Sequence, residues 1–462
     1  MILDKVFEPF VRRSPVSVML RGTLEHVVTR EPLDQLFVET AQRQYSRELL
    51  FSAVVDLLGL VVCGVRKSVN EAYEAHQEQF AVSVRSVYNK LSGVETAVSR
   101  ELVRRTARPL AELVRRLGTR RKSRLGGYRV KIIDGNHLPA TEHRLKELRT
   151  TRRGPLPGQA LVVLEPELML VTDVFPCEDG HAQERSILPE VLPNVQRDDL
   201  WMADRNFCTT AFLFGIADRQ ARFLIRQHAS TLTYELLGRR RKIGRSSTGM
   251  VYEQAMRIDR PDGKSLVIRR ITVELDQPTR DGEWVIHLVS NVPKRRAPAV
   301  ALAEGYLGRW TIENAFQELG QALNSEIHTL AYPKAALLSF CVAVWTYNVI
   351  SVLKTALEAA HGEEAQRHTI SGYYLASELS AAYHGMMIAV EPWRWKKEFG
   401  HRSVASMARV LKELAAGVRI EWFKKRVRGP KKPRPRRTSG TRYHHVSTAR
   451  LLAQRNTKTY QQ

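Results

Sequence analysis

The segment Tyr306–Glu313, with the sequence YLGRWTIE, brings together side chains that can do chemistry. With about 3.6 residues per helical turn, Tyr306, Arg309 and Glu313 fall within roughly 60° of one another around a helix axis. A phenol, a guanidinium and a carboxylate make a poor stripe for a protein core. They are well suited to hold a metal ion beside a phosphate, so the segment predicts a charged site on one face of a helix.

Two aspartates upstream each follow a strand-like apolar run. Asp134 comes after Tyr128–Ile133, and Asp204 comes after Leu200–Ala203. Strand ends are rigid enough to fix the positions of ions, and a glutamate on a packed helix can close such a site. Two strand-end aspartates together with Glu313 are the set that a two-metal phosphoryl-transfer site requires.

Each acid also has a simpler interpretation when it is taken alone. Asp134 precedes a glycine, which is typical of a turn aspartate. Asp204 can form an ordinary ion pair with Arg205, and Glu313 can form an i,i+4 helix salt bridge with Arg309. The shared site is favoured because all three acids occur in one consistent order of elements.

Phosphodiester hydrolysis or transfer would explain these residue types. It needs an activated oxygen nucleophile and a neutralised leaving oxygen, and two Mg²⁺ ions about 3.5–4 Å apart supply both. Magnesium takes hard oxygen ligands and keeps several waters, so two or three carboxylates suffice. Asp134, Asp204 and Glu313 are therefore the predicted catalytic and metal-binding residues, for two Mg²⁺ ions or for Mn²⁺ in their place. Arg309 can grip a phosphate oxygen, and Tyr306 can donate a hydrogen bond or pack on a sugar.

The charge balance predicts the class of partner. The 462 residues include 72 Lys and Arg against 48 Asp and Glu, a formal net charge of +24. Such an excess indicates a polyanionic partner, with nucleic acid as the default. Basic residues concentrate in 101–131, in Arg239–Lys242 (RRRK) and in 424–437. A basic run is often only a solvated face, but in a chain of this charge we favour contacts with a phosphate backbone.

Cysteine usage and hydropathy indicate the compartment. The four cysteines form no C-x-x-C pair, so the sequence suggests neither a zinc ribbon nor a disulfide framework, and a reducing cytosol is expected. The first residues, MILDKVFEPF, do not resemble a signal peptide. Ala335–Leu353 is uncharged and long enough to span a bilayer, but its polar residues favour a buried helix over a membrane span. We expect a cytoplasmic protein that does not contact a membrane.

The order of predicted elements indicates the fold class. After residue 125 a strand leads to Asp134, followed by a strand pair, a helix, the strand leading to Asp204, a helix and a strand. This is the order of an α/β fold of the RNase H-like kind (the retroviral integrase superfamily), a mixed sheet with helices on both faces. The predicted divisions are a helical N-terminal DNA-binding region at 1–125, the catalytic core at 126–228 and 291–350, an antiparallel β insertion at 229–290, a helical C-terminal region at 351–423 and a basic, disordered tail at 424–462.

Three short segments and the Tyr306 helix carry a family resemblance. The segments are Ile133–Asn136 (IDGN), Ala203–Phe207 (ADRNF) and Leu288–Pro293 (LVSNVP). In combination they resemble the insertion-sequence DDE transposases, in particular the IS-four-type group with a Y-x2-R-x3-E-x6-K signature. That group includes bacterial cut-and-paste transposases with a β insertion between the second Asp and the Glu. The resemblance covers roughly residues 30–350.

The resemblance implies roles for single residues. Asp134, Asp204 and Glu313 match the metal-binding acids of the family, and Tyr306 and Arg309 match its DNA contacts near the cleaved end. The remaining predicted DNA contacts are Trp284, Arg205, Gln317, Arg239, Arg240, Arg241 and Lys242.

Trp284 matches a tryptophan that in relatives stacks on a base flipped out of the duplex as a DNA hairpin forms. Such stacking is worth roughly 1–3 kcal/mol. A core aromatic in a small β domain is an equally open interpretation of Trp284. The chain departs from the signature at Gly320, where the family has a lysine, and uncharged Gln317 lies on the same predicted helix face. This puts one strand contact in doubt and leaves the metal site intact.

The resemblance implies a DNA transposase of an insertion sequence. Such an enzyme binds double-stranded DNA, both terminal inverted repeats and target, as a homodimer in a synaptic complex. It cuts and joins strands with Mg²⁺, and the β insertion suggests a hairpin intermediate by analogy. Two alternatives stay open: a DNA-binding protein of the same fold with impaired catalysis, supported only by Gly320, and a Mg²⁺-dependent nuclease that does not join strands.

Overall fold

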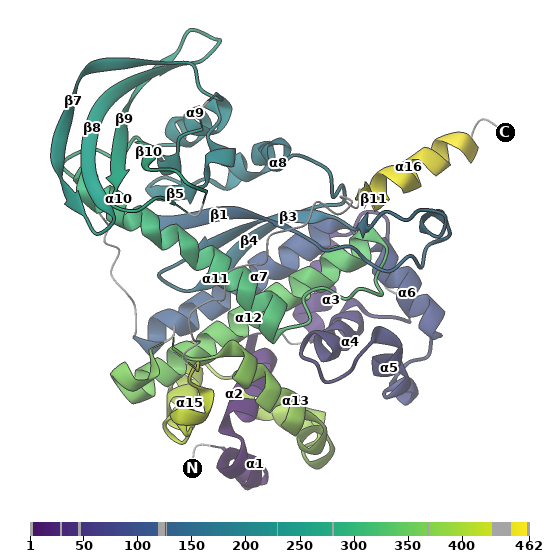
Figure 1. The fold of residues 1–462 in the computed structure, drawn as a ribbon. Coiled ribbons are helices and arrows are strands. Elements are labelled where there is room, and N and C mark those ends of the chain that lie inside the picture. Colours follow the sequence, from purple (N-terminus) through teal and green to yellow (C-terminus); the bar gives the residue numbers. More distant parts are fainter. Residues whose placement is uncertain are drawn as a thin grey trace.

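A nine-stranded mixed sheet runs through the molecule (Figure 1). The computed structural model describes residues 3–27, 30–44, 48–118, 125, 127–228, 230–279, 281–366, 369–426 and 445–459. The strands lie in the order β4-β3-β1-β5-β6-β10-β9-β8-β7. Their bounds are β1 Arg129–His137, β3 Gln159–Glu165, β4 Leu170–Cys177, β5 Asp199–Ala203, β6 Arg222–Arg226, β7 Tyr234–Ser246, β8 Gly249–Asp259, β9 Ser265–Leu275 and β10 Val285–Ser290. A separate two-stranded sheet joins β2 Pro155–Leu156 to β11 Val446–Ser447.

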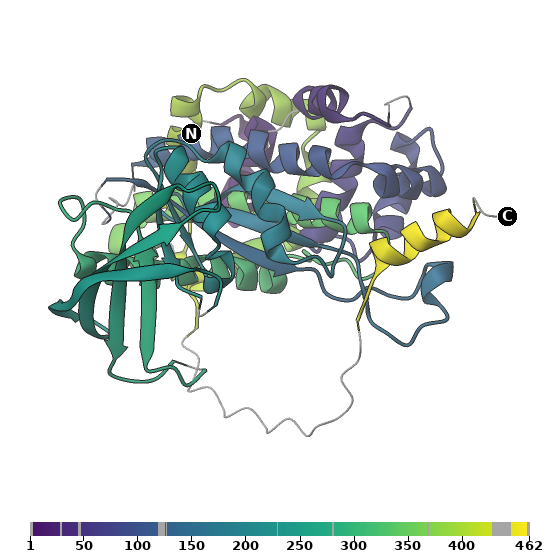
Figure 2. The ribbon, with the colours of Figure 1, turned by 90° about the horizontal axis from the view of Figure 1, so that it is seen from above.

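Helices from both ends of the chain pack together on one side of this sheet, as Figures 1 and 2 show. The N-terminal set is α1 Glu8–Arg13, α2 Pro15–Val27, α3 Arg30–Thr40, α4 Phe51–Val62, α5 Val69–Glu74, α6 Val84–Gly93 and α7 Thr96–Leu117. Between strands lie α8 Glu184–Val191 and α9 Thr210–Asp218. The later set is α10 Ala299–Tyr306, α11 Trp310–Ala322, α12 Pro333–His361, α13 Gly372–Ala389, α14 Pro392–Trp395, α15 Val404–Ala416 and α16 Thr448–Thr459.

The central strands are buried on both faces. Ile132 of β1 and Met202 of β5 belong to a large core that includes α7 and α12. Ile133 and Ala203, one residue further on, belong to a second core with α8 and α9. Side chains alternate between the two faces of a strand, so a strand covered on both faces reads as a continuous apolar run. This is why the short runs before the two aspartates were recognisable as strands.

Helix α12 is the apolar segment that is long enough to cross a membrane. The most apolar part of this helix is wholly buried in the described structure. It contacts α7, α15 and α4 and also reaches β4. The structure therefore agrees with the buried helix predicted for Ala335–Leu353. The predicted division between residues 350 and 351 falls inside α12, because one continuous helix serves both the sheet and the terminal helices.

Strands β7 to β10 show the antiparallel pairing expected for the insertion. They do not form a separate sheet, because β10 pairs with β6 of the core on one side and with β9 on the other. The basic half of strand β7 continues the pairing with β8 through two register shifts.

The predicted disordered tail is partly ordered. Val446–Ser447 pairs with β2, and α16 follows it, with Arg450 forming an ion pair of 2.7 Å to Asp179. For these residues the prediction of disorder is wrong, since tertiary pairing supplies order that local composition does not reveal. Residues 427–444, which hold most of the basic run, lie outside the described residues.

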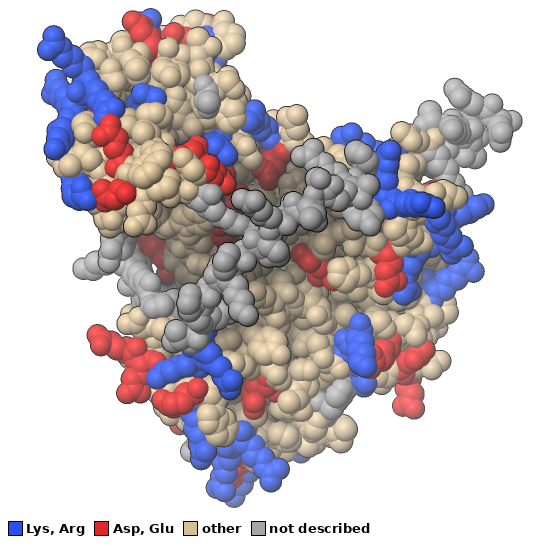
Figure 3. Space-filling view, viewed as in Figure 1, with Lys and Arg blue, Asp and Glu red and all other residues tan. Residues whose placement is uncertain are grey.

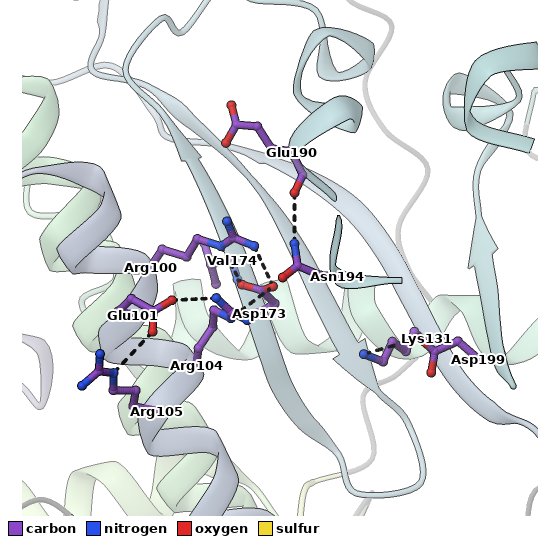
Figure 4. A network of polar contacts seen from close by, with 10 residues as sticks. All are labelled: Arg100, Glu101, Arg104, Arg105, Lys131, Asp173, Val174, Glu190, Asn194 and Asp199. Atoms are coloured by element: carbon purple, nitrogen blue, oxygen red, sulfur yellow. Dashed lines mark hydrogen bonds and ion pairs between the residues drawn. The ribbon is translucent and has the colours of Figure 1, made fainter. Parts of the chain in front are cut away.

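A polar network fastens α7 to the edge strand β4 (Figure 4). Arg100 donates from Nε and Nη2 to the two oxygens of Asp173, each over 3.0 Å. Its guanidinium also lies 3.9 Å from the centre of the Phe175 ring. Arg104 lies 3.7 Å from the same Asp173 carboxylate and is held by Glu101. A bidentate pair with an ideal fork geometry fixes both position and orientation.

Replacing Asp173 by alanine should therefore destabilise the fold. Asp173 is 8% exposed, and its removal leaves Arg100 without its carboxylate partner, so we expect a loss of roughly 2–3 kcal/mol in the free energy of unfolding. Glu142→Ala, which breaks an exposed ion pair with Arg144, should cost under about 1 kcal/mol. Urea denaturation measures both, and equal losses would show that the network does not fasten α7.

Candidate active site

The parallel pairing of β1 with β5 brings Asp134 and Asp204 side by side. Ile133 is opposite Ala203 in the register, so the two aspartates follow at the same level. Ile133 and Ala203 face the α8 and α9 side, and alternation turns both aspartates to the opposite face, toward α11. Asp134 accepts from the Gly135 amide over 3.0 Å, and Asp204 accepts from the Asn206 amide over 3.2 Å.

Asp204 ends its strand as predicted, but Asp134 does not. Strand β1 continues to His137 because β3 still pairs with it beyond the point where β5 stops. The edge of β1 beside Asp134 is therefore opened by the departure of β5. A long-range pairing of this kind leaves no mark in the sequence around Asp134.

Arg309 connects the strand acid to the helix acid. Its Nη1 donates to Asp134 Oδ2 over 3.1 Å, and its Nη2 donates to Glu313 Oε1 over 2.7 Å. The residue is only 7% exposed. The Asp204 carboxylate is near enough to influence Asp134 electrostatically. The three predicted acids thus converge at one end of the sheet's centre.

The helix expected for Tyr306–Glu313 is not continuous. A 3-10 turn at Leu307–Arg309 separates α10 from α11. The residue spacing that predicted one face of a helix also fits this arrangement, because a 3-10 turn shifts side chains by only a few tens of degrees. Arg309 lies in the turn itself and Glu313 in the first turn of α11.

Tyr306 is a buried structural partner of the site. Its hydroxyl donates to the backbone carbonyl of Ala203 over 3.2 Å, and the residue is 8% exposed. Burial raises the pKa of this phenol above its usual range. The hydrogen bond ties the end of α10 to the last carbonyl of β5, directly before Asp204. In this structure Tyr306 positions an acid and is not presented to a ligand.

Burial raises the pKa of the Asp134 carboxyl to about 6. The positive charge of Arg309 and the amide of Gly135 act against this rise, while the negative charges of Glu184 and Asp204 add to it. Desolvation penalises the ionised form, and here it outweighs the favourable charge of Arg309.

The donor set suits a hard divalent cation. Carboxylate oxygens are the ligands of Mg²⁺, which commonly uses one or two of them together with water and substrate phosphates. Among the described residues, no three Asp, Glu, His or Cys side chains lie close enough together to hold one ion. The Arg309 guanidinium donates to both Asp134 and Glu313 and so lies between them.

Arg205 and Trp284 belong to a second group of contacting residues, next to Asp204. Arg205 donates to Glu283 over 3.3 Å, and Glu283 also pairs with Arg226 of β6. Trp284 follows Glu283 and directly precedes β10. It is 58% exposed. The interpretation of Trp284 as a core aromatic is therefore wrong, and its indole is open to a ligand.

The other predicted DNA contacts lie on the surface. Gln317 and Gly320 are exposed on α11, and a side chain at Gly320 would meet open space. Arg239–Lys242 is exposed on β7, five strands from β5, or about 24 Å at about 4.8 Å per strand. Lys and Arg gather along this outer edge (Figure 3). The basic segment is thus separate from the acid site.

Two residues near the acids were missed by the sequence analysis. Trp310 is 55% exposed, and Arg309 lies 5.0 Å from the centre of its ring. It is part of the YLGRWTIE segment, where an aromatic beside the arginine was the available signal. Glu184, the first residue of α8, lies against Gly135. No spacing relates Glu184 to the other acids, so only the fold reveals it.

Comparison with known proteins decides the class. Residues 125–349 match the family model described as Transposase DDE domain. This part of the chain is therefore similar to a transposase DDE domain. The match includes Asp134, Asp204 and Glu313, and it confirms the prediction of a transposase-type enzyme.

Among curated proteins, none matches this chain. A solved structure, the piggyBac transposase synaptic complex with hairpin DNA, has a TM-score of 0.39 and 10% identity over 94% of this chain and 87% of that chain. A likeness this weak adds nothing to the assignment of the DDE domain.

The raised pKa of Asp134 predicts a pH-dependent effect of Asp134→Asn on stability. The folded-state pKa of about 6 lies above the ordinary 3.8, so wild type loses stability as pH rises from 4 to 6. The amide does not ionise. In metal-free buffer, the free energy of unfolding of the variant relative to wild type should therefore rise by about 1–3 kcal/mol between pH 4.5 and pH 7.5.

Urea denaturation at the two pH values measures this gain, with Asp281→Asn on the surface as the baseline. Arg309, Glu184 and Asp204 face the carboxyl and are unchanged in both proteins. A stability difference that does not vary with pH would contradict the burial of an ionised Asp134.

Proposed function

We propose that this transposase is encoded by an insertion sequence and acts on its terminal inverted repeats through an RNase H-like DDE site. The observation that supports this most is the convergence of Asp134, Asp204 and Glu313 around Arg309, inside the segment that matches the DDE domain. An i,i+4 salt bridge alone would not recruit a strand aspartate from 175 residues away.

Divalent ions, when bound, would activate the attacking oxygen and neutralise the leaving oxygen. The protein's part is to hold these groups in place. Tyr306 fixes the backbone before Asp204, and Arg309 fixes Asp134 relative to Glu313. A planar guanidinium matches a phosphate as well as it matches a carboxylate. Arg309 can therefore exchange an acid for a DNA phosphate as ions bind.

The exposed residues around the site supply candidate DNA contacts. The Trp284 indole is available to stack on an unpaired base, which supports the hairpin route. Arg205 beside it is partly exposed. The basic strand β7 adds a phosphate-binding edge at a distance that a duplex running across the sheet would reach. We include in this proposal a homodimer that pairs two DNA ends, membership of the IS-four-type group, and a cytoplasmic location.

A catalytically impaired relative is the second candidate, and Gly320 favours it. The position that carries a lysine in the signature is here exposed and has no side chain. The loss removes a positive charge next to the predicted DNA path, and it leaves the three acids and Arg309 unchanged. Impairment would therefore appear in DNA binding before it appears in the chemical step.

Asp204→Asn should abolish Mg²⁺-dependent cleavage of DNA that carries the ends flanking the gene. The loss of a metal-binding charge should slow cleavage by roughly 100- to 1000-fold, since bound ions contribute several kcal/mol to the transition state. DNA affinity, measured by fluorescence anisotropy, should change less than about threefold because phosphates contact basic residues. Denaturing gels would report nicks, hairpins and joined strands.

Asp198→Asn is the matched control, since Asp198 is exposed and has a positive φ that asparagine tolerates. It should cut as wild type does. Normal cleavage by Asp204→Asn would overturn the assignment of the site. Cleavage by wild type without any joined product would instead favour the nuclease.

Gly320→Lys should restore the missing contact. Both Gly320→Lys and Gly320→Ala should raise stability by up to about 1 kcal/mol, because glycine is costly within a helix. Only the lysine should tighten DNA binding. It should also steepen the slope of log affinity against log salt concentration by about one unit, because one more counterion is released. Equal DNA binding by the two variants would show that this position does not contact DNA.

A further inference from the structure

Arg226 lies at the same level of the sheet as the strand aspartates. Ala203 of β5 is opposite Ile225 of β6 in the parallel register, so Asp204 and Arg226 are the next residues on neighbouring strands. Ile225 belongs to the core on the α8 and α9 side, as Ala203 does, and alternation turns Arg226 to the face that carries Asp204. Its guanidinium is near enough to Tyr306 to act on it electrostatically. A cation therefore lies beside the acids at this end of the sheet.

Glu283 pairs with two arginines at this place. Its Oε1 accepts from Arg205 Nη1 over 3.3 Å, and its Oε2 accepts from Arg226 Nη2. Arg205 lies in the turn after β5, Arg226 ends β6, and Glu283 lies in the loop between β9 and β10. No other Asp or Glu in the described part of the chain forms an ion pair with either arginine. One carboxylate thus faces two guanidiniums, which leaves one positive charge uncompensated.

The backbone of the loop fixes the Glu283 carboxylate between the arginines. The Glu283 amide donates to Thr279 Oγ1 over 3.1 Å, and the Glu283 carbonyl accepts from the Thr279 amide over 2.8 Å. The carbonyl of Trp284 accepts from the Leu275 amide over 2.8 Å. The hydrogen bond from Arg226 and the charges of both arginines hold the pKa of Glu283 below its usual range. The carboxylate is therefore ionised at neutral pH.

Two guanidiniums on one carboxylate have the geometry of a phosphate-binding site. A carboxylate offers two oxygens to arginine as a phosphate does, and arginine pairs with both groups in the same way. Each phosphate of a DNA strand carries one negative charge, which matches the uncompensated charge of the pair. Arg205, Arg226 and Glu283 are all partly exposed, so a strand that passes Asp204 can reach them.

We propose that Glu283 is a positioning residue for DNA. It holds Arg205 and Arg226 side by side next to Asp204 in the free protein, and it releases them to one phosphate of the bound strand. The inference rests on the proposed function, because it concerns the DNA strand at the same site. The alternative is a purely structural role, in which both ion pairs only fasten the loop to the core and persist when DNA binds.

The affinity for DNA distinguishes these roles by its direction of change. Glu283→Gln keeps the size of the side chain, but it removes the charge with which a phosphate must compete. We expect the full-length variant to bind a duplex of the flanking ends about 5- to 20-fold more tightly than wild type does, with a slope of log affinity against log salt concentration steeper by up to about one unit. Glu283→Asp keeps the charge and should bind within about twofold of wild type. Fluorescence anisotropy in EDTA measures these affinities without cleavage.

Two comparisons show whether the gain comes from the arginines. Asp262→Asn removes one charge from the same insertion, at the opposite end of β9, and Arg260 keeps its second acidic partner. It should bind DNA within about twofold of wild type. When Arg205→Gln and Arg226→Gln are both present, Glu283→Gln should give no gain, because no guanidinium is left to release. Melting temperatures verify that every variant is folded.

The outcomes separate this inference from the function on which it rests. An affinity of Glu283→Gln that equals or falls below that of wild type would assign Glu283 a structural role and overturn the inference. An equal gain with and without the two arginines would show that Glu283 only repels DNA, which also overturns it. A duplex of unrelated sequence is measured as well, because a phosphate contact does not depend on sequence. If wild type does not prefer the flanking ends, the proposed function is wrong, and the unrelated duplex still decides the role of Glu283.

Discussion

The bridge from Arg309 to Asp134 and Glu313 is the interaction on which the site depends. A buried guanidinium satisfies a strand carboxylate and a helix carboxylate at once. Without it, two acids would lie close together in a low-dielectric place and repel each other. The bridge therefore lets the protein fold with these acids already gathered, and it places a buried positive charge between them.

The rest of the fold fixes the positions of the two carboxylates that this bridge joins. The early end of β5 leaves Asp204 beside an uncovered edge of β1, and Tyr306 fastens α10 to that end. On the other side, Glu318 of α11 pairs with buried Lys354 of α12. Helix α12 lies in the core of the molecule. Much of the large helical layer thus serves to fix one short helix that carries Glu313.

The elements were predictable because their apolar periodicity is local. The three acids could be singled out because each follows or begins an element, and their metal-binding role stays a prediction. Three features could not be predicted, because each depends on pairing between distant segments. They are the extension of β1 past Asp134, the single sheet that the core and the insertion form together, and the ordered structure of the tail. The 3-10 turn at Arg309 could not be predicted, because the spacing of Tyr306, Arg309 and Glu313 also fits a continuous helix. Trp284 and Glu184 show the same limit, because exposure and proximity arise only in the folded chain.

The anomalous scattering of Mn²⁺ in crystals of the protein with DNA ends tests the central claim most directly. The account predicts manganese peaks between Asp134 and Asp204 and beside Glu313, with the Arg309 guanidinium moved from at least one acid to a phosphate. Peaks elsewhere, or an Arg309 that still bridges both acids while DNA is cut, would contradict it.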